Sequence, residues 1–224
     1  MNPVLAILNI FLDPAASVRY QRAQGKLAWL PPLALAAAVS VALAYLLRPL
    51  MEGAMYNDLL EQMAEQKARE SMEMIRGTLS FSLVMTPVML AVMLAISAAL
   101  VLGFGTIMGA RLLFPEVFTL LAHCSLIPLL AQVAQAIVVK TRGSLNSMKE
   151  MQPSFGLDLL LSDDAPRLLQ GLLNYFSFFT LWYIVILGLA FAALAGVSKA
   201  KGFAMTAPVW LLGLFFALIG SVVG

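Results

Sequence analysis

The stretch GTLSFSLVMTPVMLAVMLAISAALVLGFGTIMGA, residues 77–110, decides the fold, because none of its 34 residues is Lys, Arg, Asp or Glu. A helix needs roughly 20 apolar residues to cross the hydrocarbon core of a bilayer. Residues 77–110 exceed this requirement. The stretch therefore predicts a membrane-spanning helix.

The rest of the chain repeats this pattern. Of its 224 residues, 61% are hydrophobic and 12% are charged, and the mean hydropathy is +0.90. A soluble domain carries about 25% charged residues, so this composition excludes an ordinary water-soluble fold. Four further stretches lack charge, at residues 27–47, 117–139, 168–198 and 202–224. The sequence predicts an all-α polytopic membrane protein with a bundle of five transmembrane helices.

The charge boundaries place the spans within one membrane domain. We expect them at about residues 30–47, 79–109, 115–139, 172–197 and 204–223, with extracytoplasmic loops at residues 48–77 and 140–171. As one helix, residues 77–110 would be about 50 Å long, so this span must tilt, project or break. Thr86-Pro87 and Gly103-Phe104-Gly105 are its candidate breaks, and Pro128 is expected to break the third span.

The residues before the first span, 1–26, are expected to form an interfacial arm. Asp13-Pro14 is typical of a helix start, with Asp as cap and Pro in the first turn, so we expect a short helix over residues 14–24. Arg19, Arg22 and Trp29 are candidate anchors in the headgroup region. The arm is interpreted either as a surface or partner-docking helix, or as a plain juxtamembrane segment.

Residues 51–76 are predicted to form an extracytoplasmic amphipathic helix. Met55, Leu59 and Met63 recur every four residues and define an apolar stripe. Acidic side chains outnumber basic ones in this segment, which favours a protein partner or packing within the chain over anionic lipid. These three residues are therefore candidate partner contacts. The pattern leaves open whether the segment is a separate helix or continues the second span.

Basic residues indicate the orientation of the chain. The short segments carrying Arg111, and Lys199 with Lys201, are densest in basic residues when the N-terminus is cytoplasmic. Raw counts favour the opposite side, because the two long loops hold more basic residues among many acids. The density criterion predicts a cytoplasmic N-terminus and an extracytoplasmic C-terminus.

The residue inventory excludes most enzyme classes. One His and one Cys cannot build a structural zinc site, which needs four N or S ligands. The chain contains no nucleotide fingerprint, phosphate loop or hydrolase motif. We expect no enzyme activity, no catalytic residue, and no metal or other cofactor. The net charge of +2 argues against a nucleic-acid partner.

The third span contains the polar residues that deserve a functional interpretation. Glu116 and His123 are seven residues apart, on one helix face, and ionisable groups within a span are often functional. A proton or ion pathway is one interpretation. The other is an interfacial Glu116 paired with Arg111, and a hydrogen-bonded packing histidine. Gln132 and Gln135 are further intramembrane polar candidates.

Three pairs of landmarks identify a resemblance over nearly the whole chain. They are FLDP at residues 11–14 ahead of WLPP at 29–32, FPEVF at 114–118 ahead of SLIPLL at 125–130, and FFTLW at 178–182 ahead of Gly188 and GVSKAKG at 196–202. In this order and spacing the chain resembles the bacterial branch of the Yip family, the Ypt/Rab-interacting proteins.

The resemblance implies five spans, a cytoplasmic N-terminus and residence in the bacterial inner membrane. Eukaryotic relatives bind small GTPases and shape membranes partly through a longer N-terminal region than the 26 residues here. Some bacterial members resemble accessory subunits of ABC-type exporters, beside a permease and a membrane-fusion protein. We therefore expect a non-enzymatic accessory or scaffold subunit, with lipid, other membrane proteins and possible further copies of itself as partners. A transporter using Glu116 and His123, and a membrane-shaping protein, are the alternatives.

Overall fold

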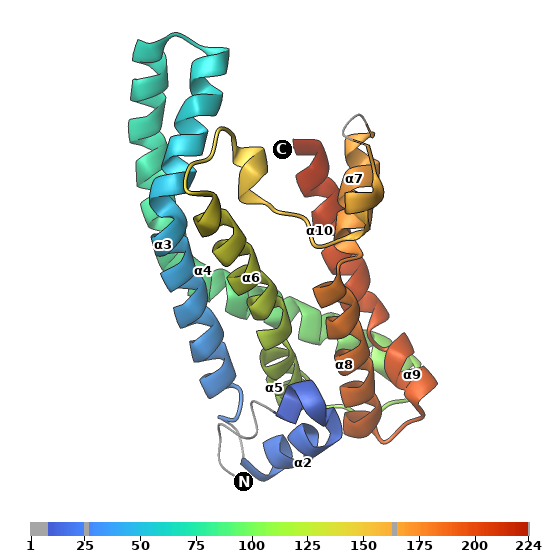
Figure 1. The fold of residues 1–224 in the computed structure, drawn as a ribbon. Coiled ribbons are helices and arrows are strands. Elements are labelled where there is room, and N and C mark those ends of the chain that lie inside the picture. Colours follow the sequence, from blue (N-terminus) through green and yellow to red (C-terminus); the bar gives the residue numbers. More distant parts are fainter. Residues whose placement is uncertain (1–8, 25–26, 163–164, 224) are drawn as a thin grey trace. The chain divides into compact units, whose positions relative to one another are not determined.

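The computed structural model describes residues 9–24, 27–162 and 165–223, and these residues form helices and no strand. Figure 1 shows their order along the chain. The α-helices are α2 (Pro14–Gln24), α3 (Leu30–Gln62), α4 (Glu65–Ile107), α5 (Phe114–Cys124), α6 (Leu126–Arg142), α7 (Arg167–Tyr175), α8 (Phe178–Ala195), α9 (Lys199–Ala204) and α10 (Ala207–Val223). Two 3₁₀ helices, η1 (Met148–Met151) and η2 (Leu157–Leu160), lie between α6 and α7.

Five helical segments of the described chain are long and apolar enough to cross a membrane. They are Leu30–Gln62, Glu65–Ile107, Phe114–Arg142, Phe178–Ala195 and Lys199–Ser221. The predicted fold class, an all-α protein with five spans, is thereby confirmed. The N-terminal helix also forms where expected, because the Asp13 carboxylate accepts a hydrogen bond of 2.9 Å from the Ala16 amide at the start of α2.

The polar segment between the first two spans differs from the expectation. Residues 51–62 belong to α3 and residues 65–76 to α4, so the single amphipathic helix predicted over 51–76 is wrong. The chain reverses at Met63-Ala64, and the two helices form a hairpin (Figure 1). Residues 51–76 are therefore neither a separate helix nor wholly part of the second span. Residues 51–62 continue the helix of the first span, and residues 65–76 lead into the helix of the second span.

Of the three alternatives left open for residues 77–110, the structure excludes a break in the helix. α3 continues through Pro49, and α4 continues through Pro87 and the Gly103–Gly105 region to Ile107. The third span breaks at Ser125, between α5 and α6, rather than at Pro128. Proline lacks the amide that would bond to the carbonyl four residues earlier and clashes with it. A break at Ser125 removes this conflict, because Pro128 then lies in the first turn of α6.

The fourth span is divided as well. α7 and α8 meet at Phe176-Ser177, where the Ser177 hydroxyl caps α8 by accepting from the Thr180 amide at 3.2 Å. α8 ends at Gly196, whose φ of 64° lies in the left-handed region that favours glycine. Ser162-Asp163-Asp164 with Pro166 is typical of a helix start. Asp163 and Asp164 lie outside the described residues, and α7 begins after Pro166.

The chain divides into two compact units. The first comprises the described parts of Met1–Ala34, Ala91–Pro128 and Ser154–Gly224, and the second comprises Leu35–Leu90 and Leu129–Pro153. In the first unit, α2 packs against α5 and α8, α9 packs against α8, and α7 packs against α10. In the second, Ala54 of α3 packs with Val139 and Leu145.

Glycines permit the closest helix approach in the first unit. A Cβ added to Gly202 in α9 would lie 2.4 Å from the Gly188 carbonyl oxygen of α8. A Cβ on Gly188 would lie 2.6 Å from the Phe203 ring. Small residues at crossings let membrane helices pack backbone to backbone. Both positions therefore require glycine for steric reasons.

The close contact between Gly202 of α9 and Gly188 of α8 predicts the effect of adding one methyl group at residue 202. Gly202→Ala should destabilise the protein by about 1–3 kcal/mol, because the backbone of α8 must move away. Thermal unfolding in detergent can be followed with a thiol-specific dye, since Cys124, the one cysteine of the chain, is buried. Gly220→Ala in α10 is the matched control, because nothing lies within 4 Å of its added Cβ. Equal midpoints for the two variants would refute the close-packing argument.

Candidate functional site

Helices α3 and α4 both extend well beyond their uncharged segments. α3 continues past Leu47 for residues 48–62, about 22 Å, and α4 contains residues 65–76, about 18 Å, before its uncharged segment begins at Gly77. Charged side chains are costly in hydrocarbon. We therefore expect the α3–α4 hairpin, residues 48–76, to project from the membrane.

A groove of about 550 Å³ lies along the hairpin. Its lining comes from one face of each helix, because the lining residues on both helices recur at intervals of three and four. They are Pro49, Glu52, Gly53 and Tyr56 of α3 and Arg69, Met72, Glu73 and Arg76 of α4. The groove thus carries charges of both signs above a buried methionine, Met72.

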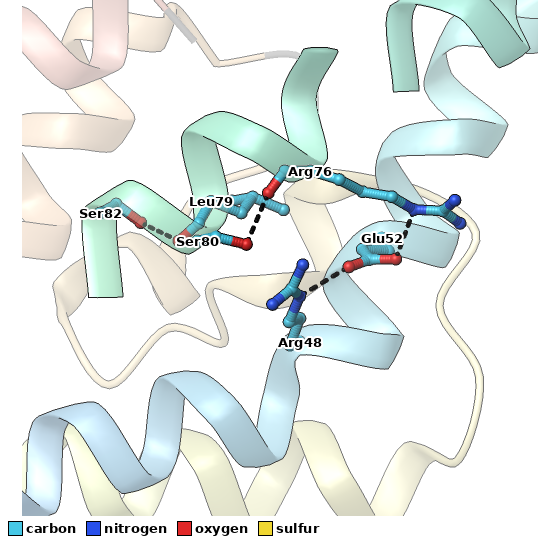
Figure 2. Close-up of polar contacts among 6 residues, drawn as sticks. All are labelled: Arg48, Glu52, Arg76, Leu79, Ser80 and Ser82. Carbon is cyan, nitrogen blue, oxygen red and sulfur yellow. Dashed lines mark hydrogen bonds and ion pairs between the residues drawn. The ribbon is translucent and has the colours of Figure 1, made fainter. Parts of the chain in front are cut away.

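Glu52 joins the two helices at the membrane end of the hairpin (Figure 2). Its Oε1 accepts from Arg48 Nε at 2.7 Å, and its Oε2 accepts from Arg76 Nε at 3.0 Å. The Arg48 hydrogen bond is the main cause that lowers the pKa of Glu52; partial desolvation opposes it, and Arg76 adds to the lowering. The charged form of Glu52 therefore holds α4 against α3 through its ion pair with Arg76.

The opposite face of α3 is braced by the segment after α6. The Asn57 side-chain amide donates to the Leu145 carbonyl at 3.2 Å, and the Asp58 carboxylate accepts from the Met148 amide at 3.0 Å. Ala54, one turn before Asn57 and Asp58 on α3, packs in the apolar cluster with Leu145. The hairpin is thus held by two kinds of contact within its own unit.

The predicted partner contacts are less exposed than the stripe suggested. Met55, Leu59 and Met63 are half-buried, and the Ser71 hydroxyl approaches the Met63 sulfur at 3.8 Å. The large apolar side chains that the hairpin exposes most are Leu60, at 42%, and Met74, at 78%. A partner docking on the hairpin would therefore meet these two residues first. The four-residue spacing of Met55, Leu59 and Met63 did not identify Leu60 and Met74, because it describes one face of a single helix. The exposed apolar residues of the hairpin come from two helices, α3 and α4.

In the first unit, Arg22 connects three helices. Its Nε lies 3.1 Å from Glu116 Oε1, and its Nη2 donates to the Leu194 carbonyl at 2.8 Å. Arg22 comes from α2, Glu116 from α5 and Leu194 from α8. These residues are up to 172 positions apart, so no local pattern could have predicted the contact.

The two other candidate anchors have different environments. Arg19 is exposed, and the Trp29 ring packs edge-on against Phe118 with centroids 5.7 Å apart. α2 itself buries Val18 and Ser17 within the first unit. The arm is therefore packed against protein over one face, with its remaining side chains directed outward.

Glu116 and His123 have separate partners. Glu116 pairs with Arg22 rather than with Arg111, and its Oε2 also lies 3.4 Å from the Leu113 amide at the start of α5. His123 is buried, and its Nδ1 lies 2.8 Å from the Thr119 carbonyl of the same helix. No hydrogen bond or ion pair of the described residues links the two, so the geometry favours the packing interpretation.

Gln132 takes part in helix packing. Ser40 of α3 donates to Gln132 Oε1 of α6 at 3.1 Å, which is a hydrogen bond between two spans of the second unit. Such bonds join transmembrane helices, at a typical strength of about 0.6 kcal/mol. Gln135, one turn further, is half-buried. Among the residues that the structure describes, no group of three or more His, Cys, Asp or Glu side chains could hold a metal ion.

These features define the class of the protein. It is a multi-pass integral membrane protein in which some polar side chains join neighbouring helices. A family model, the Yip1 domain, matches residues 8–220. The chain therefore belongs to the Yip1 family. Neither the curated proteins nor the solved structures compared with this chain include a match.

The Arg22 contact predicts a difference between two arginines of α2. Arg22→Gln should lower the free energy of unfolding by about 1 kcal/mol. The expected loss is small because the Arg22 guanidinium is half-exposed and solvent weakens its ion pair. Arg19→Gln, at an exposed position of the same helix, should have no effect. Thermal unfolding reported by Cys124 would measure both variants. Two indistinguishable midpoints would contradict a stabilising role for the Arg22 contact.

The Glu52 contact predicts a pH dependence. Because the folded protein lowers the pKa of Glu52 from 4.5, its contribution is complete well above that value and is lost as the pH falls through the folded pKa. Glu52→Gln should therefore lower the unfolding midpoint at pH 7 and match the wild type in acid. Glu73→Gln is the control variant, because it removes a carboxylate of the same groove and leaves the contact of Glu52 with Arg48 and Arg76 in place. A constant difference between Glu52→Gln and wild type would argue against this contact.

Proposed function

We propose that this protein is a non-enzymatic scaffold subunit of a larger assembly in the bacterial inner membrane, and that the assembly is an ABC-type exporter. The observation that carries the proposal is the projecting hairpin of α3 and α4. It is braced from within its own unit, yet it exposes Leu60 and Met74 outside the uncharged segments of α3 and α4. A rigid, exposed, partly apolar helical surface suits the docking of another protein.

The exporter is proposed from the resemblance to bacterial members of the family. In that arrangement the N-terminus is cytoplasmic and the hairpin lies on the opposite side, where it would meet the extracytoplasmic part of a permease or membrane-fusion protein. The mixed charges of the hairpin groove would fix the orientation of such a partner, because charge pairs contribute more to specificity than to affinity.

The test is purification of the tagged full-length protein from its native membrane in mild detergent, with mass spectrometry of the stoichiometric companions. A photo-crosslinking amino acid at Leu60 or Met74 should attach to an exporter subunit. The same amino acid at Phe81, an exposed residue in the uncharged part of α4, is the control and should attach to lipid.

A charge introduced on the hairpin should prevent association with the partner without preventing insertion of the protein into the membrane. Leu60→Glu and Leu59→Glu should each abolish co-purification of the exporter subunits while the protein remains in the membrane. Leu60 is the more informative position, because Leu59 is half-buried and its substitution also perturbs the hairpin. Retained association in Leu60→Glu would remove the hairpin from the interface. A homogeneous protein without companions would favour a self-contained transporter or a membrane-shaping role.

A further inference from the structure

The segment between α6 and α7 exposes an unusual number of leucines. Neither η2 nor α7 contains a buried residue. Their exposed large side chains form what we call the leucine patch, consisting of Leu157, Leu159, Leu160, Leu168 and Leu169. Leu159 is 69% exposed and Leu160 is 82% exposed. In water such a patch would be unfavourable, so its surroundings need an explanation.

Helix α7 lies at the depth of the last membrane span. The Tyr175 hydroxyl donates to the Trp210 carbonyl at 2.8 Å, and a Cβ on Gly171 would lie 2.5 Å from Ser221 Cβ. α7 therefore runs antiparallel to α10 from Trp210 to Ser221, and Figure 1 shows the two helices side by side. The whole of this part of α10 is uncharged and belongs to a predicted span.

The segment that leads into η2 reaches the same depth. The Phe178 amide donates to the Phe155 carbonyl at 3.4 Å, and the Phe155 and Phe179 rings pack with centroids 5.8 Å apart. A Cβ on Gly156 would lie 2.6 Å from the Asn174 carbonyl oxygen. Gly156 therefore touches the junction of α7 and α8, which lies at the start of the span formed by α8 and beside Trp210 of α10.

The chemistry of the segment suits hydrocarbon. Between Pro153 and Ser162, Asp158 is the one charged residue, and its carboxylate accepts a hydrogen bond from the Ser154 hydroxyl. The Leu159 and Leu161 amides donate to carbonyls within the same segment. Irregular backbone is tolerated at membrane depth when it is packed against protein, and here α7 and α8 provide that packing.

We propose that residues 154–160 and α7 form a re-entrant element, which folds back beside the last span and presents the leucine patch to lipid acyl chains. The occupant of the patch is the bilayer, because the patch continues the apolar surface of the neighbouring spans. Phe178 and Leu181 of α8, and Leu211 and Phe215 of α10, are exposed on those spans. Residues 154–160 are thus not part of a water-exposed loop, although sequence analysis places them in one.

Single cysteines test the proposal in proteoliposomes of the purified full-length protein. In a Cys124→Ala background, Leu160→Cys is compared with Phe215→Cys as the lipid-facing control and Lys149→Cys as the water-facing control. Lys149 belongs to the same connection between α6 and α7. Leu159→Cys replaces Leu160→Cys if the latter fails to fold, and wild-type protein with buried Cys124 sets the background.

Leu160→Cys should react with a charged maleimide at least about tenfold more slowly than Lys149→Cys, because the reactive thiolate does not form in hydrocarbon. A fluorophore on Leu160→Cys should be quenched by nitroxides on lipid acyl chains to the same extent as one on Phe215→Cys. Rapid maleimide labelling would overturn the proposal. Protection from both reagents would also overturn it, because the patch would then be covered by protein, such as a second copy of the chain.

Discussion

Every backbone amide and carbonyl that enters hydrocarbon must find its hydrogen-bond partner within the protein, and an α-helix provides that partner four residues away. This constraint accounts for the all-helical fold. It also governs the hydroxyl groups of α4, where Ser80 and Thr86 donate to carbonyls of their own helix at 2.9 Å. Ser82 does the same at 2.8 Å. A stretch with several hydroxyls can therefore remain in the membrane, because none of these groups needs water (Figure 2 shows two of them).

The sequence predicted what depends on local composition. Charge-free segments identified all five spans, and Asp13-Pro14 identified the start of α2. Proline was a poor guide to helix breaks, because a long helix retains enough other hydrogen bonds to continue past Pro49 and Pro87. The apolar stripe of Met55, Leu59 and Met63 ends where the chain reverses at Met63-Ala64, and the reversal contains no glycine or proline. The weakening of the stripe after Glu65 was therefore the local sign of the turn.

Long-range pairing could not be predicted. Arg111 is the nearest basic residue to Glu116 in sequence, yet Arg22, 94 positions away, is its partner. The same applies to Ser40 with Gln132 and to Asp58 with the Met148 amide. Each of these contacts requires two helices to be adjacent, and adjacency depends on packing across the whole unit. The interactions of these polar residues therefore depend on partners that only the three-dimensional structure supplies.

The continuity of α3 and α4 has a mechanical consequence. In the second unit, α3 and α4 each pass from the hairpin into an uncharged segment without a change of secondary structure. A continuous helix of this kind is stiff over a few turns. A displacement of the hairpin tip is therefore transmitted as a tilt of both helices, because no flexible joint separates the hairpin from the uncharged segments.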